Sequence, residues 1–386
     1  MSRLLQHPAA APTGSQSVRA ALPATAPERA APGTAAPRRV VPRGAVVAGL
    51  AGLVLLTVLV AASLGPVATS PGTVLLVLLE PARPALDAIG LGLPVAEPAH
   101  ASLVASIRLP RVLLAALTGA ALACAGAVMQ AVFRNPLAEP GITGVSSGAA
   151  CAAVLLIVTG VAQATPWALP IGAFAGALAA VAVVQGVAGI TRPGSAGTLL
   201  LVGIALNALL GAVIAAAIAN APDAEDVQRA TFWLNGDLTA ATWADVLLIV
   251  VPVLLGLAAL LCLTRELNLM VLSEEAAAAT GVNTTMVRHV GLGIAALITA
   301  ACVSVTGVIS FVGLVVPHLV RLVIGPDHRR LLPVSIAVGA VFLALADLGA
   351  RLLFSPVVLQ TGVVTAVIGA PVLLALVMRR SAAVPR

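Results

Sequence analysis

The sequence contains no lysine, and charged residues of every kind are rare. All 21 basic side chains of the 386 residues are arginine, and Asp, Glu, Lys and Arg together make up 9% of the chain. Hydrophobic residues account for 60%, and the mean hydropathy is +1.09. A soluble domain of this length cannot hide so much apolar surface, which excludes an ordinary water-soluble fold and indicates that lipid is the solvent of this chain.

The missing lysine also excludes one class of nucleotide-binding site. The phosphate-binding loop with the pattern GxxxxGK[ST] needs a lysine that contacts the nucleotide phosphates. This chain cannot hold such a loop, so we predict that it does not hydrolyse ATP by itself. No HExxH motif and no paired catalytic acids occur in the sequence, which therefore does not indicate an intramembrane enzyme either.

Cysteine and histidine are too few and too scattered to predict a metal site. We interpret the four cysteines as small buried hydrophobic residues, because each lies in an apolar run without a CxxC pair or a histidine at ligand spacing. They are Cys124, Cys151, Cys262 and Cys302. The net charge of +6 does not indicate nucleic-acid binding, because the arginines are scattered singly between apolar segments.

What the sequence does contain is a series of apolar segments, each close to the roughly 20 residues that a helix needs to cross a bilayer. Runs such as Val246 to Leu263 are apolar on every face, which favours helices over the alternating pattern of a transmembrane barrel. We therefore predict an all-α membrane protein with about ten transmembrane helices. The expected spans are residues 44–64, 109–131, 143–161, 166–190, 197–219, 242–263, 288–308, 309–325, 333–354 and 361–378.

Two segments need separate interpretation. The eighth span is short and contains Pro317, so a neighbouring helix must satisfy the carbonyl group that this proline frees. The apolar stretch from Thr73 to Leu79 is too short to cross and is expected at the outer interface. The GxxxG spacing, which allows close contact between helices, occurs at Gly144/Gly148 and Gly172/Gly176.

Residues 1–43 precede the first apolar segment and contain seven prolines. We predict a disordered cytoplasmic tail rather than a signal peptide, because the first apolar stretch begins near Gly44 and is long enough to cross the membrane. A transmembrane domain is expected over 44–380, and a short cytoplasmic C-terminus over 381–386. With both termini inside, sixteen arginines lie on the inner side and five on the outer side, in agreement with the positive-inside rule.

Polar side chains inside the expected spans face the protein interior or a water-filled path by default. They are Gln130, Gln185, Asn207, His318 and Asp347. For His318, a structural hydrogen bond beside the proline kink is the favoured interpretation. A self-sufficient secondary transporter should carry intramembrane carboxylates for ion coupling, whereas Asp347 is nearly alone in the spans, so this alternative is the weaker one.

The loop after the sixth span is predicted to contain a short helix on the cytoplasmic face. Ser273 is suited to cap its N-terminus, Glu274 and Glu275 lie in the first turn where the helix dipole favours anions, and Gly281 ends it. The residues between are small and mostly apolar, among them Ala276 and Ala277. Such a flat helix fits a docking element for another protein, with an interfacial helix on lipid as the alternative.

Three strings carry a family resemblance: NPLAEPG at 135–141, SFVGLVVPH at 310–318 and GPDHRRLLP at 325–333. Over roughly residues 50 to 380 the chain resembles the permease subunit of the iron-siderophore, haem and vitamin B12 family of binding-protein-dependent ABC importers. The resemblance implies the ten-helix fold of the vitamin B12 importer permease, in the inner (cytoplasmic) membrane. It also implies a second permease copy or a paralogue, two ATPase subunits that bind ATP and Mg, and an extracytoplasmic substrate-binding protein. This chain itself is expected to need no cofactor.

The resemblance assigns roles to single residues. The helix 273–281 would be the coupling helix that sits in a cleft of the ATPase subunit. Three arginines would meet acidic residues of the binding protein, and their place at helix ends suits charge steering. These arginines are Arg108, Arg111 and Arg351. Snorkelling to lipid headgroups, or an i,i+4 pair of Arg351 with Asp347, are the alternatives.

A constriction near the cytoplasm is the last element that the resemblance implies. Asn135 and Leu137 would form one side of it, and Ala196 and Gly197 the other. One departure from the family pattern is visible before the last span, where Val358-Leu-Gln-Thr-Gly362 replaces Glu-Leu/Ile-Pro-Val-Gly. The cargo is not determined by these residues: iron(III)-siderophore is expected on family frequency, with haem and cobalamin as alternatives.

Overall fold

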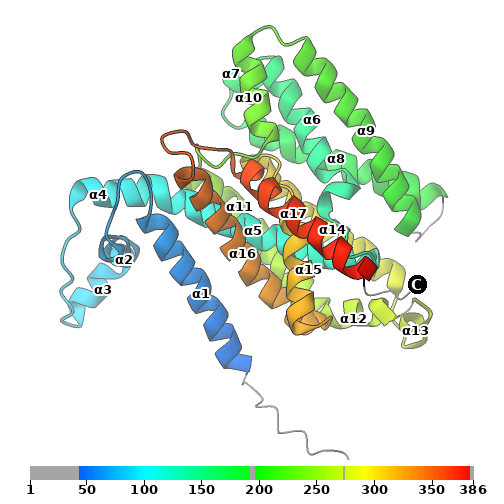
Figure 1. Cartoon of the computed structure of the whole chain (residues 1–386), viewed down its shortest axis with the longest axis horizontal. Helices are drawn as coiled ribbons and strands as arrows, with labels where there is room; N and C mark the ends of the chain where they lie inside the picture. The colour runs from blue at the N-terminus through cyan, green and yellow to red at the C-terminus, as the bar shows by residue number, and fades with distance from the viewer. Residues whose placement is uncertain (1–42, 192–195, 273, 383–386) are drawn as a thin grey trace, which may run out of the picture. The chain divides into compact units, whose positions relative to one another are not determined.

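The computed structural model describes residues 43–191, 196–272 and 274–382 (Figure 1). The described residues form helices joined by short loops and contain no strand. The prediction of an all-α fold is thus confirmed. The expected tail lies outside the described residues, except for Arg43, which begins the first helix.

Seven helices of the described residues are apolar enough and long enough to cross a membrane. In three further helices the apolar stretch is only 10–17 residues long. Together these ten helices correspond one by one to the ten expected spans. The long ones are α1 (Arg43–Ser63), α8 (Ala168–Thr191), α9 (Ala196–Ala219), α11 (Trp243–Cys262), α14 (Thr284–Thr306), α16 (His328–Leu352) and the continuous helix made of α4 (Pro98–Leu103), η2 (Val104–Arg108) and α5 (Leu109–Val132). The shorter ones are α6 (Val145–Val158), α15 (Val312–Ile324) and α17 (Thr361–Ala382).

Several short helices fill the connections between these ten. The stretch expected at an interface is α2 (Pro71–Leu79), which begins at a proline after the capping residue Ser70. Helix α10 (Ala224–Leu234) was not expected, although Glu225 and Asp226 in its first turn are typical of a helix start. The remaining ones are η1 (Glu80–Ala82), α3 (Arg83–Ala88), η3 (Pro140–Thr143), α7 (Val161–Ala164), α12 (Thr264–Leu272) and α13 (Glu274–Ala279).

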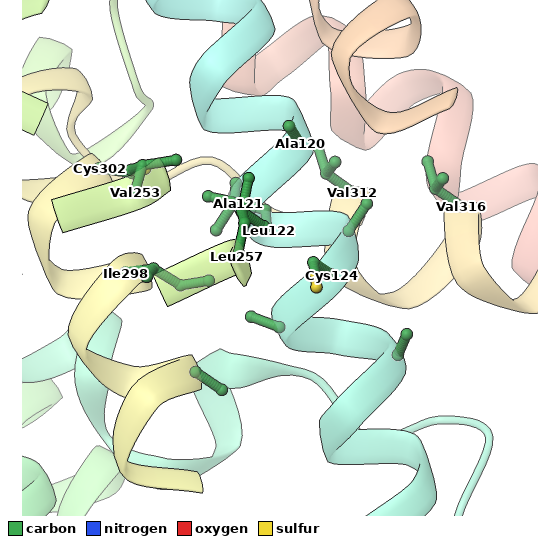
Figure 2. Packing of buried hydrophobic residues seen from close by; sticks show 14 of the residues in the cluster. Ala120, Ala121, Leu122, Cys124, Val253, Leu257, Ile298, Cys302, Val312 and Val316 are labelled. Carbon is green, nitrogen blue, oxygen red and sulfur yellow. The ribbon is translucent and has the colours of Figure 1, made fainter. Parts of the chain in front are cut away.

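Helix α5 is the centre of the bundle. It packs against α11, α14, α15 and α16, and its membrane-crossing window is 89% buried. Figure 2 shows part of this core, where side chains of α5 lie among those of α11, α14 and α15. The labelled residues are Ala120, Ala121, Leu122 and Cys124 of α5, Val253 and Leu257 of α11, Ile298 and Cys302 of α14, and Val312 and Val316 of α15. By contrast, the windows of α1 and α9 are 22% and 11% buried, as expected of helices that face lipid or another chain.

Glycines allow the closest of these contacts. A β-carbon at Gly119 would overlap the carbonyl oxygen of Gly339 on α16, and one at Gly126 would overlap that of Gly313 on α15. The GxxxG glycines Gly148 and Gly176 meet in the same way between α6 and α8, as their spacing predicts. At these crossings the backbones approach so closely that no side chain fits between them.

The kink in the eighth span has the partner that the sequence requires. Pro317 has no N–H to donate to the carbonyl of Gly313. Gln130 of α5 donates instead, with its Nε2 at 3.4 Å from Gly313 O and 3.1 Å from Leu314 O. The prediction that a neighbouring helix satisfies the freed carbonyl is confirmed.

The cysteines are buried with one exception. Cys124, Cys151 and Cys302 have little or no exposed surface, whereas Cys262 is exposed at the last residue of α11. The prediction of burial was wrong for Cys262, because the apolar run does not reveal which face of the helix points away from the core. No group of three or more His, Cys, Asp or Glu in the described part of the chain is placed to hold a metal ion.

Candidate functional site

Two of the predicted docking residues converge on one buried carboxylate. Arg111, in the first turn of α5, donates hydrogen bonds to both oxygens of Asp347 at 2.8–3.0 Å. Arg351 lies one turn later on α16, with its Nε 3.2 Å from Asp347 Oδ2. Thr361, the first residue of α17, donates its hydroxyl to the same carboxylate at 3.0 Å. Asp347 therefore joins α5, α16 and α17 at one end of the bundle.

Arg351 and the third predicted docking residue, Arg108, also cap the C-terminus of helix α1. The last four carbonyls of a helix have no partner within the helix itself. Arg351 donates to Ala61 O, and Arg108 donates to Ala62 O, each at 3.0 Å. Arg108 makes further bonds to the carbonyls of Ser63 and Val67 and to the hydroxyl of Thr69. These bonds fasten α1, which is otherwise little buried, to α5 and α16.

We name Arg108, Arg111, Asp347 and Arg351 the arginine cluster. The exposed fractions of its arginines are 5%, 7% and 5%, in that order, so their guanidinium groups are used largely inside the chain. The pair of Arg351 with Asp347 is confirmed, whereas contact of the three arginines with a binding protein stays a prediction. Arg111 and Arg351 are paired with Asp347, whereas Arg108 is bonded to neutral carbonyl and hydroxyl groups. The four members of the cluster therefore carry two positive charges more than negative ones.

The helix predicted over 273–281 is present as α13, and its role in coupling stays a prediction. Its C-terminus is a Schellman motif: Val282 N–H donates to Ala277 O at 3.2 Å, and Gly281 N–H donates to Ala278 O at 2.9 Å. Gly281 has φ +83°, the left-handed conformation that glycine adopts readily. The prediction that Gly281 ends the helix is confirmed. Ser273 and the side chains of Glu274, Glu275 and Ala276 lie outside the described part of the chain.

The two sides of the predicted constriction line one cavity. Asn135 and Gly197 both contribute to it, together with Phe133, Ala138, Ile142 and Leu200, and its volume is about 100 Å³. Asn135 also organises its own loop, because its Oδ1 accepts the N–H of Leu137 at 2.9 Å. The side chain of Leu137 is 42% exposed, while that of Ala196 lies outside the described residues. The role of these residues as a gate stays a prediction.

A larger cavity of about 270 Å³ lies where α6 and α15 begin. Its polar lining comprises Glu139, Ser146, Ser147, Asn207, Thr299 and Ser310. Glu139 accepts the N–H of Phe311, the residue before α15, which has a strained φ of +69°. Burial raises the pKa of the Glu139 carboxyl, and the bond from Phe311 opposes this rise only in part.

Sequence reasoning missed the roles of Glu139 and Asp347. The sequence analysis names Glu139 only as part of the NPLAEPG string. It places Asp347 among the interior-facing polar residues and as a possible partner of Arg351, but not as a partner of Arg111. The bond between Arg111 and Asp347 joins residues 236 positions apart, so no local spacing could reveal it. Asp347 does sit inside an apolar run, which by itself calls for a buried partner of opposite charge.

In the part of the chain that the structure describes, nine apolar helices surround the buried tenth, α5, and a polar cavity lies where α6 and α15 begin, which defines the class of this chain as a multi-pass membrane protein. The comparison with known sequences gives the family. The sequence profile of the FecCD transport family matches residues 53–379, and the chain belongs to this family.

Three curated permeases illustrate the relationship. The cobalamin import system permease protein BtuC of Halobacterium salinarum is 44% identical over 282 residues, which cover 72% of this chain and 74% of the relative. The hemin transport system permease protein HmuU of Yersinia pestis is 41% identical, over 71% of this chain and 83% of the relative. The Fe(3+) dicitrate transport system permease protein FecD of Escherichia coli is 39% identical, over 70% and 84%.

The fold has a counterpart among solved structures. A metal-chelate type ABC transporter in an inward-facing conformation superposes with a TM-score of 0.75 at 30% identity. The match covers 87% of this chain and 99% of the other. The family resemblance and the fold expected from the sequence are thereby confirmed.

Proposed function

We propose that this chain is the permease subunit of an ATP-driven importer whose cargo is an iron(III)-siderophore complex. The observation that carries the proposal is the family match over residues 53–379. Relatives named for hemin and for Fe(3+) dicitrate support an iron-bearing cargo, and the relative named for cobalamin supports the principal alternative within the family.

The permease is proposed to move its cargo without changing it covalently. ATP is split by two partner ATPase subunits, because the chain has no lysine and therefore no phosphate-binding loop of the GxxxxGK[ST] type. Helix α13 contacts these subunits, and the cavity beside Asn135 and Gly197 belongs to the gate on the same side. A second permease copy or a paralogue completes the pathway.

The arginine distribution supports an orientation with both termini in the cytoplasm. The arginine cluster then lies at the extracytoplasmic end, where a substrate-binding protein docks. Because its guanidinium groups are bonded within the chain, the cluster acts on acidic residues of that protein through its two surplus positive charges rather than through free side chains. Such steering weakens as the salt concentration rises.

A secondary transporter is the alternative from another class, and one observation disfavours it. A carboxylate that couples transport to an ion must be free to bind that ion. Asp347 is ion-paired with Arg111 and Arg351, and it also accepts a hydrogen bond from the hydroxyl of Thr361. This carboxylate is therefore occupied by the protein itself.

Uptake by a deletion strain tests the proposed cargo. We expect loss of ⁵⁵Fe-siderophore uptake on deletion of the gene and recovery on its return, with ⁵⁷Co-cobalamin and iron-labelled haem measured in parallel. Loss of cobalamin or haem uptake alone would move the cargo to that class while keeping the permease function. Transport by the purified chain in liposomes without any ATPase subunit would overturn the importer proposal itself.

A further inference from the structure

Asn268 lies at the centre of helix α12, directly before α13, and bonds this helix to the start of α16. The Nδ2 of Asn268 donates to Asp327 Oδ1 at 2.7 Å, and its Oδ1 accepts the backbone N–H of His328 at 2.8 Å. The Nδ1 of His328 lies 2.8 Å from the same oxygen. Because an amide oxygen only accepts, His328 carries a proton on Nδ1. Both halves of the Asn268 amide are thus used on the start of α16.

The partners of Asn268 lie at the N-terminus of α16. Asp327 is the N-cap of this helix, and its Oδ1 also accepts the N–H of Arg329 at 3.1 Å. His328, the first residue of α16, is 1% exposed. On the α12 side, Leu267 and Met270 flank the asparagine and are buried in the core. The bond between Asn268 and Asp327 is itself exposed, but it is flanked by buried side chains on both helices.

A second bond holds α12 to α5. Arg134, which follows the end of α5, donates its Nε–H to the carbonyl of Met270 at 2.9 Å. Helix α12 is thus attached to both α5 and α16. Helix α12, which precedes α13, is therefore bonded to the end of α5 through Arg134 and to the start of α16 through Asn268.

Helices α5 and α16 are in extensive contact with each other. Gly119 and Gly339 bring their backbones into contact near the middle, and Arg111 joins Asp347 at the far end. Helix α16 has 25 residues and is therefore about 37 Å long. One end of this pair carries the tie to α12, and the other carries the arginine cluster.

We propose that Asn268 is the positioning residue that fixes the ATPase-facing segment α12–α13 to the α5–α16 pair. ATP-driven displacement of α13 then reaches the arginine cluster as the movement of one body. The inference rests on the proposed function, because it requires an ATPase partner at α13. It names the bond through which that partner acts on the far side of the membrane.

The test uses the complete complex in lipid nanodiscs and a reporter at the far end of α16. Leu353, the capping residue at the C-terminal end of α16 and 67% exposed, is replaced by cysteine (Leu353→Cys) in a Cys262→Ser background. The rate of its reaction with a water-soluble maleimide is measured without nucleotide and with ATP plus vanadate. With Asn268 intact we expect the two rates to differ about fivefold or more, the lower end of typical coupling between distant sites.

Two variants at position 268 separate the tie from general damage. Asn268→Ala should retain co-purification of the ATPase and its hydrolysis of ATP, while the ratio of the two rates falls close to one. Asn268→Asp should do the same, because it loses the donor and faces Asp327. The double variant Asn268→Asp/Asp327→Asn should recover the ratio, since the new amide at 327 donates to the new carboxylate at 268 and keeps an acceptor for Arg329 N–H.

Asn220→Ala is the matched control. The Asn220 side chain is exposed and donates to Ala216 O, one turn earlier in the chain, so its loss should leave the ratio unchanged. A wild-type ratio in Asn268→Ala, or no recovery in the double variant, overturns the inference while leaving the proposed function intact. Failure of any ATPase to co-purify with the unaltered chain overturns both.

Discussion

Asp347 has no exposed surface and faces the guanidinium groups of Arg111 and Arg351. Removing one partner of a buried ion pair costs about 3–5 kcal/mol, because the remaining charge is left without compensation. We predict that Asp347→Asn lowers the free energy of unfolding by about this amount. Thermal unfolding of the detergent-solubilised protein measures it. Asp87→Asn, at an exposed position, is the control, and equal stability of the two variants would contradict the prediction.

The carboxyl of Glu139 gives a prediction about pH. Burial raises its pKa above the ordinary value of about 4.3, so the folded state binds the proton more tightly than the unfolded state. The resulting stability is present in full below pH about 4.3 and is lost as the pH rises through the folded-state pKa. We therefore expect the unfolding temperature to fall across this window.

Glu139→Gln removes the titrating group and keeps an acceptor for the N–H of Phe311. The unfolding temperature of this variant should depend less on pH than that of the unaltered protein, with the difference growing above the ordinary pKa of a glutamate. Glu97→Gln, whose side chain is 68% exposed, serves as the control. Parallel pH profiles for Glu139→Gln and the unaltered protein would refute the assignment.

At the scale of helices, the close crossing of α5 and α15 depends on glycine. A β-carbon at Gly126 would overlap the carbonyl of Gly313, the same carbonyl that Gln130 satisfies beside the proline kink. Gly126→Ala should therefore destabilise the protein by about 1–3 kcal/mol, as overpacked cores do. Gly211→Ala, in α9 with open space around it, should be neutral or stabilise by about 0.4–1 kcal/mol. Thermal unfolding of both variants measures the two stability changes. Equal changes in stability would contradict the close approach of α5 and α15 at Gly126.

The helices could be predicted from the sequence more fully than their contacts. Hydropathy finds each of the ten spans, because burial in lipid imposes a length and an apolar composition on a helix regardless of its neighbours. Helix α10 was missed, since its amphipathic pattern is short and carries several charges. The early start of the second span at Pro98 was also missed, because Arg108 and Arg111 look like the end of a membrane segment until their buried partners are known.

In the candidate site, too, local features could be predicted from the sequence, whereas contacts between distant segments could not. The end of the coupling helix at Gly281 is a local property of the backbone, so its residue type predicts it. The bonds of Asn268 to Asp327 and His328 join the segment before the coupling helix to the string GPDHRRLLP, yet nothing in either segment shows that they meet. Polar partners across a bundle are set by the packing of whole helices, which the one-dimensional pattern does not contain.

For the whole molecule, burial is distributed unequally among the helices. Helix α5 is enclosed by its neighbours, while α1 and α9 present most of their surface outward. A chain of this kind gains its internal stability around one central helix and leaves broad apolar faces for lipid and for a second permease. The proposed contact with the ATPase subunits is confined to the short segment at α13, so we expect assembly to depend on few residues.

The charges at the start of α13 give the prediction for the assembled complex. Glu274 and Glu275 occupy the first turn, where the helix dipole favours negative charge and where the proposed ATPase contact lies. Glu274→Lys/Glu275→Lys reverses both charges, so it should abolish co-purification of the ATPase subunits while the chain still inserts into the membrane in normal amounts. Glu97→Lys, a single reversal at an exposed residue near the other end of the bundle, should leave assembly unchanged. Normal recovery of the ATPase with the double variant would show that α13 is not the contact, and the transmission proposed through Asn268 would then need another origin.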